Sequence, residues 1–318
     1  MAKTPKRIFD DKMDFLDNAE NSLKKSASVA ERWLFRRILE DIIPELQTDA
    51  NGQIVNNATN VNILTNKLNS VFRTFGSTQN KELVTQILGD FQGISALNTD
   101  YFTTVTGRTA DEFLSVKKRV EVLMQRSLGI QADGTIKPNS FISGITSNDA
   151  INEEIREIAV RNIQGGNTIK DFTAELSDAI KTDKDGLGVL NRHYRQTVQD
   201  RYSQYERAES KTYADVLKLQ AFIYSGGKVQ DTRRFCCQRN GLVFTRDEAQ
   251  KWRAIDFQGK NKGYVPLVDL GGYNCRHSTQ WITNAQALRR RPDLKLNDEG
   301  KLVPDRTKPK QKLKRGCK

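Results

Sequence analysis

The strongest constraint on the fold of this chain is a series of apolar stripes that fills its first two thirds. Apolar residues recur there at every third or fourth position, which places them on one face of a helix. The stripes begin near residues 34, 61, 83 and 113, and a longer one spans 190–219. All four cysteines follow residue 235, so we expect packing between helices, and not disulfides, to hold this part together.

Glycine, asparagine and aspartate mark the places where these helices stop. Gly-containing turn sequences at 49–54, 131–136 and 297–302 each precede an apolar residue, which predicts a tight turn or small hairpin. Between residues 147 and 181 we expect two shorter helices, separated by Gly165 and Gly166. Asn167 or Thr168 is the natural start of the second of them.

The pattern changes after residue 220 to short apolar runs that are typical of strands, at 221–224, 241–244 and 264–268. We therefore expect an α+β fold that is predominantly α-helical. Its parts are an N-terminal helical region at 1–146, a small α+β domain at 147–288 and a flexible basic tail at 289–318.

The amino-acid composition limits the classes of protein to which this chain can belong. The formal net charge is +12, and no stretch approaches the roughly 18 consecutive apolar residues of a membrane-spanning helix. The N-terminus turns acidic at Asp10, where a signal peptide needs its apolar region. We expect a soluble protein with no membrane partner. His193 and His277 are the only histidines, which leaves little room for a Ser-His-Asp apparatus, so we expect no enzyme.

The last third carries one ordered set of charged and sulfur-bearing residues. Carboxylate and guanidinium groups bind each other through charge-assisted, bidentate hydrogen bonds, so the charged members are expected to tie the preceding helix to the sheet. The set consists of Arg207, Glu209, Asp231, Arg233, Cys236, Gly241, Asn274, Cys275 and Arg276.

This set resembles the Mu F-like family of phage minor head proteins. In that family a helix carrying Arg-Thr-Glu leads into a strand, then an Asp-x-Arg turn, a cysteine or histidine five residues before a glycine, and a Pro-Asn-Cys-Arg-Cys closure. Here Ala208 replaces the threonine, Tyr273 the proline and His277 the final cysteine. The resemblance covers roughly residues 147–282.

The resemblance implies a minor structural protein of a tailed-phage head, found in the head interior of the virion and in the host cytoplasm during assembly. Its partners would be the portal protein, the major capsid protein or both, in head assembly and genome ejection, with no small-molecule substrate. Two alternatives stay open. One is a nuclease or toxin-like enzyme carried in the head, with Glu209, Asp231 and His277 as acid–base groups. The other is a nucleic-acid-binding protein outside any virion.

Cys236, Cys275 and His277 are candidate ligands for a metal, and zinc is the ion that this mixture of thiolate and imidazole favours. Two other states remain open. A disulfide from Cys236 or Cys237 to Cys275 would be disfavoured in a reducing cytosol, and the cysteines can instead stay reduced and only pack. No other cofactor is expected.

The C-terminal segment is strongly basic. Residues 286–318 contain twelve Lys or Arg and four Asp or Glu, and the last thirteen residues contain no acid. Such a segment cannot bury enough apolar surface to fold alone, and its cations can neutralise phosphates, so we expect a flexible arm that binds double-stranded DNA. The alternative is a solvated tail that only aids solubility or docks on an acidic protein surface. The DNA-binding candidates are Arg289, Arg290, Arg291, Arg306, Lys308, Lys310, Lys312, Lys314, Arg315 and Lys318.

Overall fold

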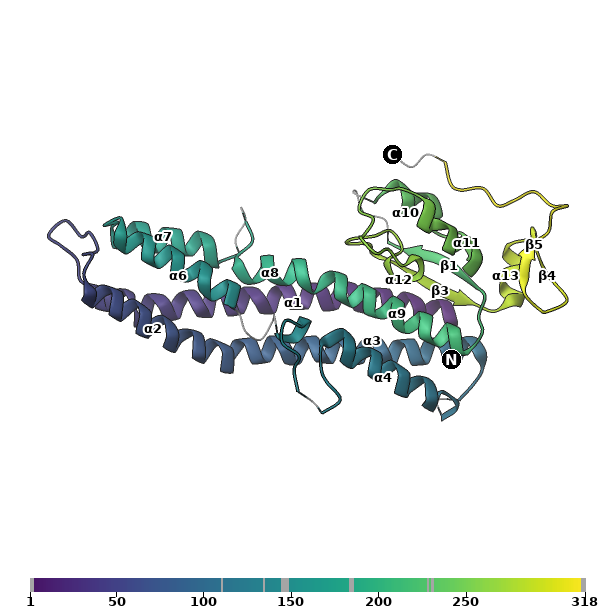
Figure 1. Cartoon of the computed structure of the whole chain (residues 1–318), viewed down its shortest axis with the longest axis horizontal. Coiled ribbons are helices and arrows are strands. Elements are labelled where there is room, and N and C mark those ends of the chain that lie inside the picture. The colour runs from purple at the N-terminus through teal and green to yellow at the C-terminus, as the bar shows by residue number, and fades with distance from the viewer. Residues whose placement is uncertain are drawn as a thin grey trace. The chain divides into compact units, whose positions relative to one another are not determined.

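The computed structural model describes residues 3–109, 111–133, 135–143, 149–182, 186–227, 229 and 232–315 (Figure 1). Helices dominate, and the strands form small antiparallel sheets, which confirms the expected α+β class with mainly α content. In chain order the elements are α1 (Pro5–Asp41), η1 (Ile43–Glu45), α2 (Ala58–Ser77), α3 (Gln79–Thr106), η2 (Asp111–Phe113), α4 (Leu114–Leu128), α6 (Asp149–Gln164), α7 (Ile169–Ile180), α8 (Val189–Thr197), α9 (Gln199–Val216), β1 (Ala221–Gly226), α10 (Arg234–Arg239), β2 (Val243–Thr245), α11 (Arg246–Gln250), η3 (Lys251–Ala254), α12 (Pro266–Asp269), β3 (His277–Ile282), α13 (Asn284–Arg290), β4 (Leu294–Leu296) and β5 (Leu302–Pro304).

The chain forms two compact units that are interleaved along the sequence. Unit 1 comprises Met1–Asn18, Phe91–Ser127 and Gln199–Lys318, and unit 2 comprises Ala19–Asp90 and Leu128–Val198. Helices α1 and α3 each contribute residues to both units. The expected boundaries at 146/147 and 288/289 do not coincide with these units, because a local apolar pattern locates a helix without saying what it packs against.

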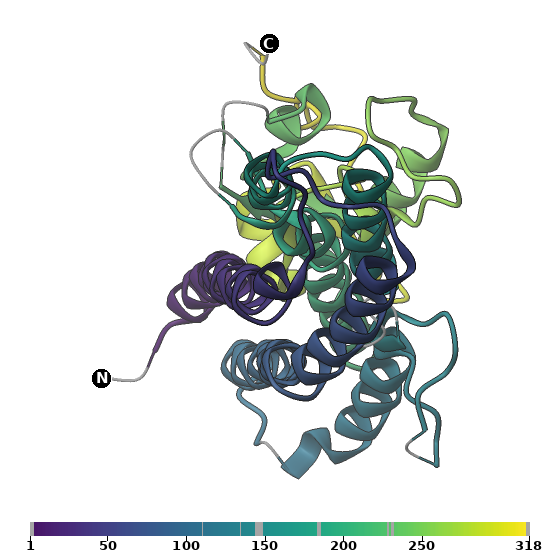
Figure 2. The same cartoon turned by 90° about the vertical axis from the view of Figure 1, so that its left-hand side faces the viewer.

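Unit 2 is helical. The sequence predicts the start of α7 correctly, whereas α1 begins at Pro5, well before the apolar stripe that starts near residue 34. Helix α2 starts at Asn57, whose side chain accepts a hydrogen bond from the Asn60 N–H, and α7 starts at Thr168, which caps the Asp171 N–H. Each helix buries its apolar stripe. Helix α6 packs against both α2 and α7 (Figure 2).

The three expected turns are present. In each, the backbone N–H of the first turn residue donates to the carbonyl oxygen four residues later, and in two of them an isolated bridge closes the hairpin. Gly52 and Gly300 adopt φ values of 76° and 71°, which favour glycine. The bonds join Asp49 to Gln53, Gln131 to Thr135 and Asn297 to Lys301.

The main sheet of unit 1 is antiparallel, with the strand order β2-β1-β3. Alternate residues of a strand point to opposite faces, so β1 divides its side chains between two apolar clusters. Phe222 and Tyr224 join an aromatic cluster with Trp281, whereas Ala221 and Ile223 pack with residues of the α13 and β4–β5 region.

The expected strand at 264–268 is wrong. Pro266 begins the short helix α12, because proline lacks the N–H that a sheet ladder needs and suits the first turn of a helix. The third strand of the sheet is β3, which follows the Asn274-Cys275-Arg276 sequence directly. Among the described residues, no helix combines the length and hydrophobicity that a bilayer crossing requires.

The expectation of a loose arm beginning at residue 289 needs correction. Helix α13 continues to Arg290, and the hairpin of β4 and β5 buries Leu294 and Leu302. Arg291 is only 3% exposed and forms ion pairs with Glu248 and Asp293. The high charge of this segment hid the two buried leucines and the paired arginine that connect it to the rest of unit 1.

Beyond β5 no helix or strand occurs in the described residues, yet the backbone still contacts the body of unit 1. The Gln311 N–H donates to the Asp293 carboxylate at 3.2 Å, and the Lys314 N–H donates to the Gln238 carbonyl oxygen at 3.0 Å. The basic segment at 305–315 therefore lies along the surface of unit 1.

Candidate metal centre

Three potential metal ligands meet inside unit 1. Cys236 comes from helix α10, Cys275 from the loop before β3, and His277 is the first residue of β3. All three side chains are buried, and their ligand atoms lie within 4.8 Å of one another. These residues could therefore hold a metal ion, as the sequence predicts.

The spacing of the donor atoms suits zinc. The two Sγ atoms are 3.8 Å apart, and the Sγ of Cys275 is 3.9 Å from Nδ1 of His277. Two sulfurs bound at about 2.3 Å to a tetrahedral zinc ion lie about 3.8 Å from each other. Cys236 and Cys275 are both free in this structure, so neither Cys236 nor Cys237 forms the disulfide to Cys275 that the sequence left open.

A glycine allows the two sulfurs to approach. A Cβ added at Gly271 would lie 2.1 Å from the Sγ of Cys236 and 2.9 Å from the Sγ of Cys275. The Gly271 N–H also donates to the Sγ of Cys275 at 3.3 Å, which stabilises sulfur in its charged form. Any larger residue at this position would displace a ligand.

Arg207 fixes the loop that carries two of the ligands. Its side chain is 1% exposed, and its Nη1 donates to the carbonyl oxygens of Cys275 and His277, both at 2.9 Å. The neighbouring Asn274 has a φ of 55°, and its N–H donates to the Asp200 carboxylate at 2.7 Å. Helix α9 thus holds the backbone around the ligands from one side.

The electrostatics favour a thiolate at Cys275. The hydrogen bond with Cys236 holds the pKa of Cys275 well below its usual range, and the bond with His277 and the charge of Arg207 act in the same direction. The same thiol–thiol contact raises the pKa of Cys236. The Cys275 sulfur is therefore a thiolate that can bind a cation, and the Cys236 thiol would lose its proton when a metal binds.

Two further polar groups lie beside the sulfurs, the Tyr224 hydroxyl and the Nε2 nitrogen of His277. The Tyr224 hydroxyl donates to the Sγ of Cys236 at 3.2 Å. Nε2 of His277 is buried and has no hydrogen-bond partner in the part of the chain that the structure describes. Nδ1 is the ring nitrogen near the Sγ of Cys275, so it is Nδ1 that could bind a metal, and the unpaired Nε2 adds no support for a ligand role.

Two charged members of the predicted set have partners other than the expected ones. Glu209 faces helix α3, where Ser95 and Asn98 donate to its carboxylate. Arg233 donates to the carbonyl oxygen of Gly271 at 3.3 Å. Among the described residues Glu209 therefore pairs with neither Arg207, which binds backbone carbonyls, nor Arg233.

Three further members complete the set. Gly241 has a φ of 80°, and its N–H donates to the carbonyl oxygen of Tyr224, so it serves a tight turn. Arg276 is exposed beside the buried Cys275. Asp231, which we expected in the turn, lies outside the described residues, and so does Lys318 of the basic segment.

Sequence reasoning missed a buried ion pair in unit 1. Lys12 and Glu206 are fully buried and bind each other, with Asn98 Oδ1 3.0 Å from the Lys12 Nζ and Ser278 donating to Glu206. The lysine holds the pKa of Glu206 low against the opposing effect of burial. The sequence contained one sign of this buried pair. Lys12 lies on a face of its helix whose other members, Ile8, Phe9 and Leu16, are apolar.

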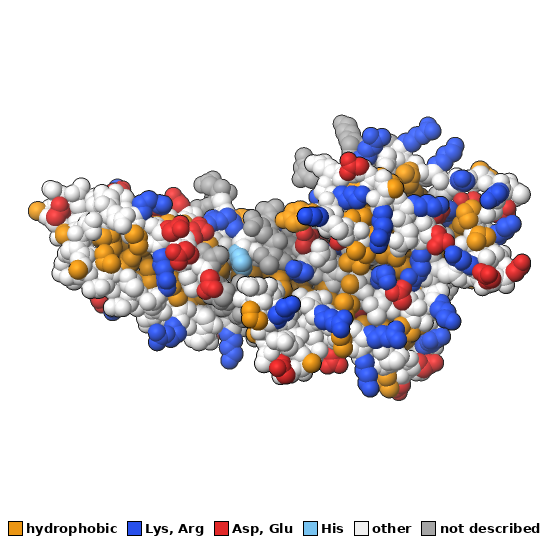
Figure 3. Space-filling model, in the orientation of Figure 1, with side chains coloured by type: hydrophobic (Ala, Val, Ile, Leu, Met, Phe, Trp, Pro, Cys, Tyr) orange, Lys and Arg blue, Asp and Glu red, His pale blue; other side chains and the backbone are white. Residues whose placement is uncertain are grey.

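Most of the basic residues that are candidates for binding DNA lie on the surface of unit 1. Arg289 and Arg290 end helix α13 and are exposed, as are the basic residues from 306 to 315 (Figure 3). Arg291 is the exception, because its burial between two carboxylates removes it from any contact with phosphates.

No protein-family model matches the chain, and no curated protein or solved structure matches it either.

Proposed function

We propose that this chain is a minor structural protein of a tailed-phage head, in which a zinc-bound unit 1 acts as a rigid module and the C-terminal segment contacts packaged DNA. The observation that carries the proposal is the arrangement of the residues of the resemblance. Cys236 and Cys275 face each other, and Arg207 binds the backbone of the loop that carries Cys275. Residues that are distant in sequence thus serve one buried centre.

The chemistry of this centre supports a structural role. Its ligands are buried and enclosed by Tyr224 and Gly271, and a closed site of sulfur and imidazole is typical of zinc that stabilises a fold. Zinc would bridge α10 to the start of β3 through Cys236 and Cys275, which are both free. Of the acid–base groups in the enzyme alternative, Glu209 and His277 are buried and bind different partners, which does not support a shared catalytic centre.

The metal part of the proposal is tested by elemental analysis of protein purified without added chelator. We expect about one zinc per chain, and we expect Cys236→Ser and Cys275→Ser to lose it. The matched control is Thr279→Val, which changes a buried residue of the same strand as His277 whose hydroxyl has no hydrogen-bond partner among the described residues. Stoichiometric absence of metal from the wild-type protein would contradict a zinc centre.

The DNA part of the proposal is supported by the exposure of the cations at 306–315. Binding to a duplex is measured at several salt concentrations, because each phosphate contact makes the fall of log affinity with log salt steeper by about 0.9. Replacing three exposed lysines by glutamine should make this fall less steep by nearly 3, whereas replacing three exposed lysines elsewhere, as a control, should leave it unchanged. The test set is Lys308, Lys310 and Lys312, and the control set is Lys81, Lys118 and Lys170.

The location in a virion is tested by mass spectrometry of purified particles from infected cells. We expect the chain at a small fraction of the copy number of the major capsid protein, together with the portal protein. Its absence from particles, with normal abundance in the host cell, would favour the alternative of a nucleic-acid-binding protein outside virions.

A further inference from the structure

The candidate metal centre supplies three ligands from cysteine and histidine, whereas a structural zinc ion is bound by four. The hydroxyl of Tyr224 lies beside both sulfurs of this centre. Its oxygen is 3.2 Å from the Sγ of Cys236 and 3.8 Å from the Sγ of Cys275. Oxygen also binds zinc in proteins, so Tyr224 is a candidate for the fourth ligand.

The distances from the Tyr224 oxygen fit a tetrahedral site. A sulfur bound to zinc at about 2.3 Å and an oxygen bound at about 2.0 Å lie about 3.5 Å from each other. The two observed distances, 3.2 Å and 3.8 Å, lie on either side of this value. The ring of Tyr224 also faces the imidazole of His277, with 5.1 Å between the ring centroids. The hydroxyl is therefore at the distance from both sulfurs that a fourth ligand requires.

The fold holds Tyr224 firmly in this position. Tyr224 lies in β1 opposite Thr279 of β3. Its N–H donates to the carbonyl oxygen of Leu242, and its carbonyl oxygen accepts from the Gly241 N–H. Its side chain is fully buried, and its ring packs edge-on against Trp252. A side chain that is already fixed by its neighbours loses little conformational freedom when it binds a metal.

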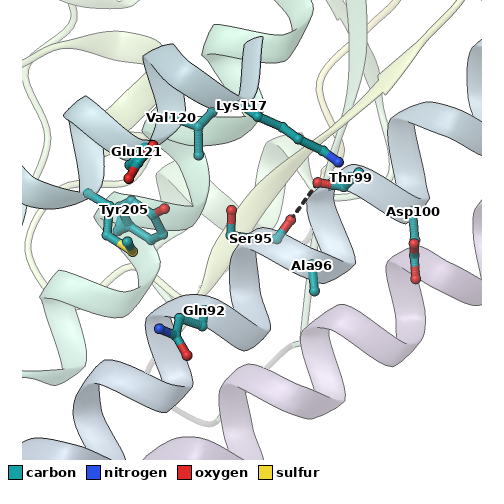
Figure 4. A pocket seen from close by; sticks show the side chains of 10 residues that line it. Gln92, Ser95, Ala96, Thr99, Asp100, Lys117, Val120, Glu121 and Tyr205 are labelled. Carbon is teal, nitrogen blue, oxygen red and sulfur yellow. Dashed lines mark hydrogen bonds between the residues drawn. The ribbon is translucent and has the colours of Figure 1, made fainter. Parts of the chain in front are cut away.

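Solvent is poorly placed to supply the fourth ligand instead. The four donor side chains are at most 4% exposed. The open cavity of about 560 Å³ in unit 1 is lined by residues of α3, α4 and α9, such as Ser95, Val120 and Tyr205, and by none of the four donors (Figure 4). Gly271 limits the space on another side, because a Cβ added there would lie 3.3 Å from the Tyr224 hydroxyl.

Arg207 compensates the charge that a fourth anionic ligand would bring. Two thiolates neutralise the charge of a zinc ion, so a phenolate would leave the centre with one negative charge. The side chain of Arg207 is 1% exposed and donates to the carbonyl oxygens of Cys275 and His277. A buried guanidinium beside the centre offsets the cost of burying that negative charge.

We propose that Tyr224 is the fourth ligand of the zinc ion, which completes a site of two sulfurs, one imidazole nitrogen and one phenolate oxygen. The O–H bond of Tyr224 breaks when the zinc–oxygen bond forms, and the proton passes to solvent. The hydrogen bond from Tyr224 to the Sγ of Cys236 is then replaced by the metal–oxygen bond. This inference rests on the proposed zinc centre and assigns its remaining ligand.

The test uses the full-length, zinc-loaded protein, from which a chelator removes the metal stepwise under reducing conditions. A phenolate absorbs at longer wavelength than a phenol, in a region to which zinc-bound thiolates do not contribute. We expect a phenolate absorption equivalent to about one tyrosine per chain, lost in proportion to the zinc removed. Tyr224→Phe should lack this absorption. The matched control is Tyr213→Phe, which removes another buried hydroxyl of unit 1, bound to Thr99, and should keep it.

A second measurement separates a ligand from a residue that only donates a hydrogen bond to sulfur. The loss of such a hydrogen bond also weakens metal binding, by about 10- to 100-fold, so affinity alone does not decide. With cobalt in place of zinc, Tyr224→Phe should have an open fourth position. Added thiocyanate should therefore shift the visible spectrum of the variant and leave that of the wild type unchanged.

The outcomes distinguish this ligand from the zinc centre itself. One zinc per chain without phenolate absorption, the same absorption in Tyr224→Phe, or a thiocyanate shift in the wild type would each overturn the assignment of Tyr224 and leave the zinc centre intact. The absence of zinc from the wild type would contradict both. The wild-type absorption decides the assignment even where Tyr224→Phe fails to fold.

Discussion

Glu209→Gln should remove a specific pH dependence from the stability of unit 1. Burial raises the pKa of Glu209 to about 7 from an ordinary value of 4.5, with the nearby Glu206 adding to the rise. Between these two pH values folding takes up a proton, so the free energy of unfolding falls as the pH rises. A difference of about 2.5 pH units at about 1.36 kcal/mol per unit predicts a loss of about 3 kcal/mol between pH 4.5 and 7.

The variant isolates this contribution, because glutamine keeps an oxygen that can accept from Ser95 and never ionises. Below pH 4.5 the variant and the wild type should have similar stability, whereas at pH 8 the variant should be more stable by about 3 kcal/mol. Urea unfolding between pH 5 and 8 is followed by fluorescence of the buried Trp281. Metal content is checked at each pH.

Glu206→Gln is the matched control and should act in the opposite direction. Lys12 lowers the pKa of Glu206, so the pair stabilises the protein above the unfolded pKa of the carboxyl and is lost as the pH falls through the lowered value. The variant leaves a buried lysine unpaired, which should cost about 3–5 kcal/mol at neutral pH. Equal pH slopes for the wild type and Glu209→Gln would refute the reasoning.

Two further changes test the packing around the candidate metal centre, and a third tests a helix cap in unit 2. Gly271→Ala should lower zinc affinity and the melting temperature, because its methyl group would overlap the Sγ of Cys236, whereas Gly76→Ala, which has open space and a helical position, should be neutral or stabilising. Arg207→Lys should cost roughly 2 kcal/mol in urea unfolding, since an ammonium cannot reproduce the planar fork at two carbonyl oxygens. Asn57→Ala should cost about 1 kcal/mol by removing the cap of α2, with a loss of helical circular dichroism on heating as the readout.

The helices were predictable because their signal is local. The apolar period located α2, a capping residue located the start of α7, and the turns at Gly52 and Gly300 followed from their sequences. Strand β3 was missed because its six residues include His277, two hydroxyl residues and Gln280, and only its pairing with β1 makes it a strand.

The candidate metal site was predictable in part, because its residue types are rare in this chain. Sulfur and imidazole are rare in this chain, so Cys236, Cys275 and His277 stood out even though they lie on separate elements. Arg207 and Glu209 were also identified, but their partners were not, because a backbone carbonyl or an amide on another helix leaves no mark in the sequence near them.

The long separation between Lys12 and Glu206 also bears on how the chain is made. The two residues are 194 positions apart, and residues 199–318 belong to the same unit as the first helical turns. On a ribosome, the early lysine emerges long before the glutamate that neutralises it. Unit 1 can therefore close only late in synthesis, and until then the nascent N-terminal helix exposes an apolar face that a chaperone could bind.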